Sequence, residues 1–303
     1  MKKSILSVIP AAAMLLLLLF PDISFEGAKN GLLLWFNIVL PTLLPFMLIS
    51  ALIVAWGGVP VLTRPLSPLF RFFHLSGQGS YAFLCGLLCG YPMGAKTTAD
   101  FVKSGELTSQ EGKRLLAIAG APSPMFLAGY VRLCLPGEIP FIFATAAMYL
   151  PVVLLIILSG IVYKVPAVVS AREKAADTGN SVRSFDELLM DSLEIMVKVG
   201  GYIMLFSILA AFADLFLPPG LFLKPLLLGF IEMTTGIKAI STSMSSLPAA
   251  AAIIASAAFG GLSGVFQTNT VIKNAGLSIR HYVLWKLLHA GLSALILILA
   301  ASL

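Results

Sequence analysis

Charged residues are scarce in this chain of 303 residues: they make up only 11% of it, against about 25% in a soluble domain. Hydrophobic residues account for 58% instead. This composition excludes a soluble enzyme, a disordered protein and a nucleic-acid-binding domain. It predicts an all-α polytopic membrane protein. The net charge of +6 then reflects Lys and Arg in cytoplasmic loops, and we expect no nucleic acid partner.

Cysteine is also scarce, with three residues that lack the spacing of a metal site. Cys85, Cys89 and Cys134 all lie in apolar surroundings, as small buried hydrophobes do. P-loops, dinucleotide-binding fingerprints and zinc motifs are missing from the sequence. We therefore expect no metal and no cofactor, and ATP-driven transport by this chain alone is disfavoured.

Seven apolar stretches are long enough to cross a bilayer, which takes about 17–25 residues. They are residues 4–20, 31–56, 110–132, 139–163, 191–214, 246–270 and 281–302. Two further apolar segments, 80–104 and 222–244, are interrupted by the sequences GYPMG and EMTTG. Each is long enough for two half-helices and a tight tip, so the sequence predicts about seven transmembrane helices plus two re-entrant hairpins.

The Lys and Arg residues predict the orientation. If the N-terminus is cytoplasmic and neither hairpin crosses the membrane, 13 basic residues fall inside, 3 fall outside, and 4 lie within spans or hairpins. This asymmetry is typical of the positive-inside rule. The N-terminal stretch resembles a signal peptide, but it has no convincing cleavage site, and we interpret it as an uncleaved span.

Short matching segments indicate an internal repeat. Phe46–Ser50 resembles Ile203–Ser207, and Gly94-Ala95-Lys96 resembles Gly236-Ile237-Lys238. We divide the chain into an N-terminal helix and loop (1–30), a first repeat (31–163), a cytoplasmic linker (164–190) and a second repeat (191–303). Three crossings in each repeat give the halves opposite orientations, an arrangement common in secondary transporters. The first repeat contains hairpin 80–104 and broken helix 110–132, and the second contains hairpin 222–244 and broken helix 246–270.

The hairpin tips predict a binding site for a small anion. Unwound backbone and half-helix N-termini attract negative charge, and a lysine follows each tip. From the hairpins we select Gly90, Tyr91, Pro92, Gly94, Lys96, Thr97, Thr234, Thr235, Gly236 and Lys238. In the alternative reading, the two lysines pair with Asp100 and Glu232 and only stabilise the hairpins.

The broken helices supply the remaining candidates. Ser123, Ser263 and Gln267 follow helix-breaking Pro or Gly residues and carry groups that can hydrogen-bond a carboxylate or an amide. Close helix packing by small residues is the alternative. Glu232 is the acidic residue predicted deepest in the membrane, with a coupling or gating role or a permanent pair with Lys238 as the two readings.

One pattern resembles an enzyme. Gly261-Leu262-Ser263-Gly264 fits the GxSG sequence of intramembrane serine proteases, with His281 and His289 downstream. However, Ser123 and its neighbours occupy the corresponding place in the first repeat, which a protease does not explain. We therefore predict that the chain is not an enzyme.

Three segments carry a family resemblance. Cys89–Lys96, Phe230–Gly236 and Phe259–Gln267 resemble segments of the YlbJ/SpoVV sporulation integral membrane proteins, within a similarity over about 31–302. That family belongs with the nucleoside recognition, or Gate, domains and resembles the membrane core of concentrative nucleoside transporters. The resemblance implies the two-hairpin, inverted-repeat fold. It also implies a role in moving dipicolinic acid across the outer forespore membrane.

The function predicted from these observations is a secondary transporter or facilitator of a small organic anion, with dipicolinate as the first candidate, working by alternating access. A transporter of nucleosides or other small solutes stays open as an alternative, as does a non-transporting role in spore envelope assembly. The expected location is the bacterial cytoplasmic membrane or the outer forespore membrane. The expected partners are the anion and the lipid bilayer, and the homo-oligomeric state stays open.

Overall fold

The computed structural model describes residues 2–164, 184–218, 220–221 and 223–302, and every regular element within them is helical. Five helical segments are long and apolar enough to cross a membrane. They are Pro21–Ala55, Phe141–Tyr163, Phe185–Phe216, Ser246–Ala275 and Ile279–Ala301. The predicted all-helical polytopic class is thereby confirmed.

The first half of the chain runs from α1 to α11. Its elements are α1 (Lys2–Leu19), α2 (Pro21–Leu34), the π-helical turn η1 (Trp35–Val39), α3 (Leu40–Ala55), α4 (Val59–Thr63), η2 (Arg64–Leu66), α5 (Ser67–Phe72), α6 (Gly77–Cys89), α7 (Met93–Lys103), α8 (Ser109–Ile118), α9 (Pro124–Phe126), η3 (Leu127–Val131), α10 (Arg132–Cys134) and α11 (Phe141–Tyr163). We call α6–α7 the first hairpin and residues 119–123, between α8 and α9, the first break.

The second half repeats this order of elements. It consists of α12 (Phe185–Phe216), α13 (Lys224–Ile231), α14 (Met233–Ser243), α15 (Ser246–Phe259), α16 (Gly261–Ile272), η4 (Lys273–Ala275) and α17 (Ile279–Ala301). We call α13–α14 the second hairpin and Gly260, between α15 and α16, the second break. In both halves a long helix precedes a hairpin, a broken helix pair and another long helix.

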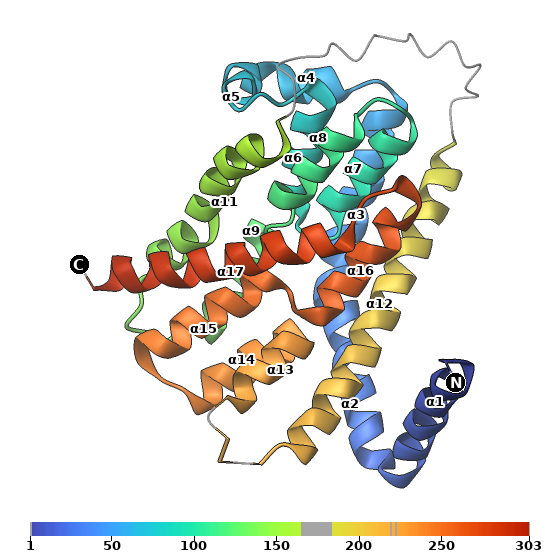
Figure 1. Ribbon diagram of the computed structural model, residues 1–303, viewed down its shortest axis with the longest axis vertical. Coiled ribbons are helices and arrows are strands. Elements are labelled where there is room, and N and C mark those ends of the chain that lie inside the picture. Colours follow the sequence, from blue (N-terminus) through green and yellow to red (C-terminus); the bar gives the residue numbers. More distant parts are fainter. Residues whose placement is uncertain (1, 165–183, 219, 222, 303) are drawn as a thin grey trace.

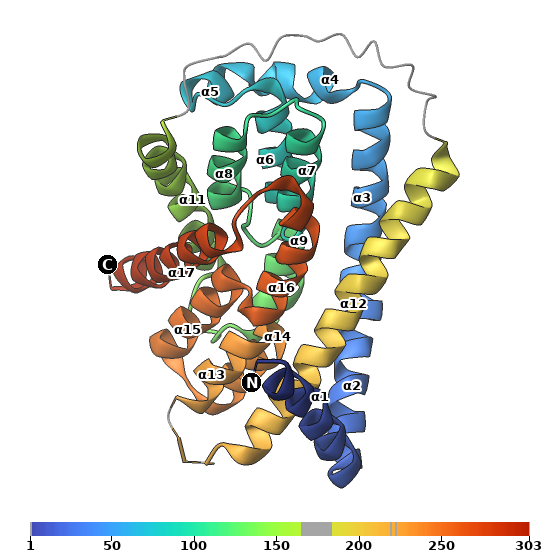
Figure 2. The ribbon, with the colours of Figure 1, turned by 45° about the vertical axis from the view of Figure 1, so that its right-hand side comes forward.

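The two halves are placed around a common centre (Figure 1 and Figure 2). The first hairpin lies in the upper part of the molecule and the second hairpin in the lower part. The continuous helix α2–α3 and helix α12 lie side by side and run in opposite directions along the long axis (Figure 2). The hairpin tips therefore approach the middle of the molecule from opposite ends.

Glycine pairs hold each hairpin together. A Cβ atom on Gly94 would lie 2.7 Å from the Cα atom of Gly86, and a Cβ atom on Gly236 would collide with the backbone of Gly229. The two helices of each hairpin therefore touch through their backbones, as small residues allow in membrane helix pairs. We call these two contacts the glycine seams.

Several predicted boundaries are wrong. The loop placed before residue 31 is helical, because Pro21 suits the first position of a helix and α2 continues without a break into α3. The predicted linker (164–190) extends too far, because a capping box of Ser184 and Glu187 starts α12 at Phe185. The rest of that linker, residues 165–183, lies outside the described residues.

Two of the seven predicted spans are not among the five long apolar helices. The predicted span 4–20 corresponds to α1 (Lys2–Leu19), whose described apolar part is Val8–Leu19. The predicted span 110–132 is divided by the first break, where Gly120 and Pro122 interrupt the helix. The second broken span, 246–270, keeps enough helix on both sides of Gly260 to qualify by length.

Candidate functional site

A cavity of about 560 Å³ lies where the two hairpin tips and the two breaks meet. Its walls come from α2, η1 and α3, from both tips, and from the helices that follow both breaks. Seven of the residues selected from the sequence line it: Gly90, Tyr91, Ser123, Glu232, Thr234, Ser263 and Gln267. Asn37, Thr42 and Tyr130 add further polar groups to walls that are otherwise mostly apolar.

The tip of the first hairpin places Tyr91 between the two repeats. Gly90 reverses the chain after α6 with φ +81°, which favours glycine, and the Tyr91–Pro92 peptide bond is cis. The Tyr91 ring lies against the second break, where a Cβ atom on Gly260 would be 2.9 Å from the ring. The Tyr91 hydroxyl donates to the sulfur of Met233, at the tip of the second hairpin. One side chain of the first repeat thus contacts both functional segments of the second.

The tip of the second hairpin is organised by Glu232, which is 2% exposed. Its carboxylate accepts hydrogen bonds from the Thr234 amide at 3.2 Å and the Thr235 amide at 2.8 Å, and so caps the N-terminus of α14. The Thr235 hydroxyl donates at 2.9 Å, and the Thr234 hydroxyl also donates to the same carboxylate. The amides and hydroxyls of these two threonines therefore satisfy the buried carboxyl group of Glu232.

The two breaks present helix N-termini to the cavity. Ser123 caps α9 by accepting from the Phe126 amide at 3.2 Å. Gly260 opens α16 with φ +87°, and within the described residues no side chain caps that end. Ser263, in the first turn of α16, accepts from the Gln267 amide at 3.0 Å. These N-termini and hydroxyls can receive a carboxylate, although each break also ends a preceding helix.

A buried lysine that was not selected from the sequence contacts both the first break and the tip of the first hairpin. Lys286 of α17 is 3% exposed, and its ammonium donates to the Gly120 carbonyl at 2.6 Å. This carbonyl follows the C-terminus of α8, where a cation is favourable. The same ammonium lies 4.7 Å from the centroid of the Tyr91 ring. The sequence does contain a signal for Lys286, because burying a lysine within the apolar stretch 281–302 costs free energy and so points to a partner or a function.

The two lysines near the tips do not meet. Lys96 forms an ion pair with Asp100 at 2.7 Å, the stabilising contact that the sequence analysis kept as its alternative. Lys96 lines a smaller pocket of about 160 Å³ that shares Gln267 with the central cavity. Lys238 is exposed and is absent from the described lining of both spaces. Each lysine lies about one helical turn beyond its tip, which carries its side chain away from the centre, and Glu232 binds threonines instead of Lys238.

The remaining selected residues lie in the two hairpins but outside the described lining of the central cavity. Gly94 and Gly236 form the glycine seams, and Thr235 bonds Glu232. Pro92 and Thr97 are buried in the first hairpin, and neither is among the described lining of the central cavity. Tyr130, which the sequence analysis did not select, lines the cavity and donates from its hydroxyl to the Thr234 carbonyl at 2.8 Å. It therefore joins the first broken helix to the second hairpin.

The residues of the protease-like pattern have other partners. Ser263 accepts from Gln267, as described above, and His289 contacts the Met148 carbonyl at 2.9 Å through Nε2. His281 lies beside Tyr163, with ring centroids 6.2 Å apart.

Comparison with known proteins finds a similarity that covers most of the chain. The chain is 26% identical over 317 aligned positions to the sporulation integral membrane protein YlbJ of Bacillus subtilis (strain 168), covering 92% of this chain and 78% of YlbJ. No family profile and no solved structure matches the chain. The similarity runs through both hairpins and both breaks, as the three motifs predicted. The chain is an integral membrane protein related to the YlbJ sporulation proteins.

Proposed function

We propose that the chain is a secondary transporter or facilitator of a small organic anion, with dipicolinate as the first candidate, that exchanges access between its two repeats. The observation that carries this proposal is the single cavity lined by both hairpin tips and both breaks. In secondary transporters built from repeats, substrate sites lie where discontinuous helices meet near the midplane. The similarity to a sporulation membrane protein makes sporulating cells the first place to test the chain, with the outer forespore membrane as the proposed location.

The choice of an aromatic anion is supported by the chemistry of the walls. The volume of about 560 Å³ is within the range that holds small organic molecules. Tyr91, Phe126 and Tyr130 offer aromatic surface, while the N-termini of α9 and α16 favour a carboxylate. Lys286 lies against the Tyr91 ring and donates to the Gly120 carbonyl, outside the described lining of the cavity.

The neutral-solute alternative also has an observation in its favour. The charged group that lines the cavity is the carboxylate of Glu232, and the other polar groups there are hydroxyls and amides such as Ser263, Gln267 and Asn37. This set can hydrogen-bond a nucleoside without a cation. A competition between uridine and dipicolinate therefore separates the two substrate classes.

The test is uptake into proteoliposomes. Purified protein is reconstituted, and uptake of labelled dipicolinate, uridine and citrate is measured with and without imposed pH and sodium gradients. We expect saturable dipicolinate uptake that falls at least tenfold in Ser263→Ala with Gln267→Ala, since both residues line the cavity. Ser159→Ala is the matched control, because this buried serine bonds only its own helix in the described structure. Uptake of uridine alone would support the nucleoside alternative, and no uptake under any gradient would support the assembly role.

Glu232 is proposed as the coupling or gating residue. Its carboxylate faces the cavity and holds the tip of the second hairpin through both threonines. In Glu232→Gln we expect gradient-driven accumulation to be lost while exchange between internal and external substrate continues, because exchange needs no net movement of a coupling ion. Glu106→Gln, at an exposed turn, should keep both activities. Loss of both activities in a folded Glu232→Gln protein would assign this residue to substrate binding or the tip structure.

A further inference from the structure

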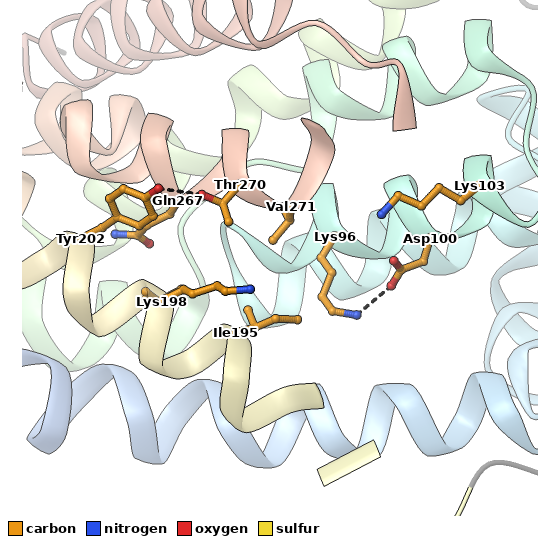
Figure 3. Close-up of a pocket in the computed structure, with 10 residues that line it drawn as sticks. Lys96, Asp100, Lys103, Ile195, Lys198, Tyr202, Gln267, Thr270 and Val271 are labelled. Carbon is orange, nitrogen blue, oxygen red and sulfur yellow. Dashed lines mark hydrogen bonds and ion pairs between the residues drawn. The ribbon is translucent and has the colours of Figure 1, made fainter. Parts of the chain in front are cut away.

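The smaller pocket lies beside the central cavity and is lined by three helices, each of which contributes one face (Figure 3). Helix α7 supplies Lys96, Asp100 and Lys103, which are spaced four and three residues apart and so share a side of the helix. Helix α12 supplies Lys198 and Tyr202, and α16 supplies Gln267 and Thr270. The pocket has a volume of about 160 Å³.

The charge of this pocket is positive. Three ammonium groups and one carboxylate line it, and the ammonium groups of Lys103 and Lys198 point toward the space between the helices (Figure 3). Asp100 pairs with Lys96 at 2.7 Å, but the side chain of Asp100 is half exposed (51%), whereas that of Lys96 is 24% exposed. Lys198 pairs with Glu194, which is 66% exposed and is not among the described lining residues. Both acidic partners are at least half exposed, so neither pair is locked inside the protein, and an incoming carboxylate can compete for either lysine.

Gln267 links the two spaces. It is 7% exposed, and it lines both the basic pocket and the central cavity. Its amide donates to Ser263 on the cavity side, while Thr270, one turn further along α16, donates to the Tyr202 hydroxyl at 3.1 Å on the pocket side. Gln267 therefore lies at the boundary between the basic pocket and the central cavity.

We propose that this basic pocket is a second anion site, which binds a carboxylate-bearing solute on its way to or from the central cavity and exchanges it for Asp100 at Lys96. The inference rests on the proposed function. It adds that anions are selected by their charge at Lys96, Lys103 and Lys198, outside the central cavity. Lys238 has no part in this site. The site attracts anions at long range and is correspondingly sensitive to salt.

The experiment compares single charge changes in the proteoliposome assay with dipicolinate as the probe. Lys103→Gln and Lys198→Gln should each raise the KM about three- to tenfold and leave kcat near that of the unchanged protein, because rim charges act on capture more than on later steps. Both changes should also flatten the dependence of KM on ionic strength. Asp100→Asn should lower KM, since it removes the competing carboxylate. Lys273→Gln, an exposed lysine outside the described lining, is the matched control.

Two outcomes would overturn the site. One is a KM in Lys103→Gln and Lys198→Gln equal to that of the control at low salt, and the other is a higher KM in Asp100→Asn. If the unchanged protein takes up no dipicolinate, the proposed function fails, and calorimetric binding of dipicolinate to the detergent-purified protein decides the site instead. Weaker binding in both lysine variants than in Lys273→Gln supports the site, whereas equal binding, or none in any variant, overturns it.

Discussion

The ammonium of Lys286 lies 4.7 Å from the centroid of the Tyr91 ring and donates to the Gly120 carbonyl at 2.6 Å. One cation from the last helix thus joins the tip of the first hairpin to the first break. The same ring also lies against the second break, where a Cβ atom on Gly260 would be 2.9 Å from it. Lys286 therefore holds the aromatic group through which the two repeats touch.

Replacing Lys286 by Met should lower the free energy of unfolding by about 1–3 kcal/mol, because it leaves the buried Gly120 carbonyl unpaired and removes the cation beside Tyr91. Lys286→Arg keeps the cation and should lose less. The measurement is unfolding followed by tryptophan fluorescence in detergent, with Lys273→Met as the exposed control. A Lys286→Met protein as stable as this control would show that the contact has no structural weight.

Cys89 offers a natural reporter of the central cavity. It ends α6, lines the cavity and is 6% exposed. In a protein with Cys85→Ala and Cys134→Ala, we expect a small thiol reagent to modify Cys89 slowly, and dipicolinate to slow the reaction further by occupying the same space. The rate is read by mass spectrometry, and Cys89→Ala sets the background. If saturating dipicolinate leaves the rate unchanged, the solute does not bind in this cavity.

Arg114 is predicted to be a structural anchor outside the central cavity. Its guanidinium donates to the His74 carbonyl at 2.9 Å, the Phe73 carbonyl at 2.6 Å and the Ile156 carbonyl at 3.3 Å. Arg114→Met should cost about 3 kcal/mol of stability, because three carbonyls, that of Ile156 buried and the other two partly buried, lose their donor at once. Arg114→Lys should recover only part of the loss, because an ammonium lacks the planar set of N–H groups with which a guanidinium reaches several carbonyls. The exposed Arg71→Met is the control, and equal unfolding midpoints would contradict the assignment.

The orientation predicted from the Lys and Arg asymmetry can be tested with two exposed glutamates. Glu106 lies in the turn between α7 and α8, and Glu138 lies in the turn between α10 and α11. With the other cysteines replaced, an impermeant maleimide added to intact cells should label Glu138→Cys and leave Glu106→Cys unlabelled until the cells are opened. The reverse pattern would place the N-terminus outside.

The elements with strong sequence signals were predicted within a few residues. The GYPMG and EMTTG interruptions lie where α6 gives way to α7 and α13 to α14, because Gly, Pro and a capping Glu stop and restart helices locally. The start of α2 was missed although Pro21 suits the first position of a helix: the polar stretch that follows reads as a loop, yet it is helical and packs along α12. Propensity alone does not contain that tertiary contact.

The site was predicted less completely for a similar reason. Residues at the tips and breaks lie at the cavity because backbone interruptions gather there, and this can be read from one sequence. The partners of charged side chains depend on three-dimensional neighbours far along the chain. Lys286 and Gly120 are 166 residues apart, and Tyr130 and Thr234 are 104 apart, so local spacing gave no indication of either contact. The selection of Lys96 and Lys238 for one anion site rested only on their positions after the two tips.

The glycine seams have a consequence for the dimensions of the central cavity. Because the helices of each hairpin touch through their backbones at Gly86 and Gly94 and at Gly229 and Gly236, neither hairpin has room for a side chain between its helices. A methyl group at Gly236 would meet the backbone of Gly229, and one at Gly94 would collide with the Ala119 carbonyl, so either would force the backbone beside a tip to move. Gly94 and Gly236 lie outside the described lining of the cavity, yet they fix the backbone that shapes it.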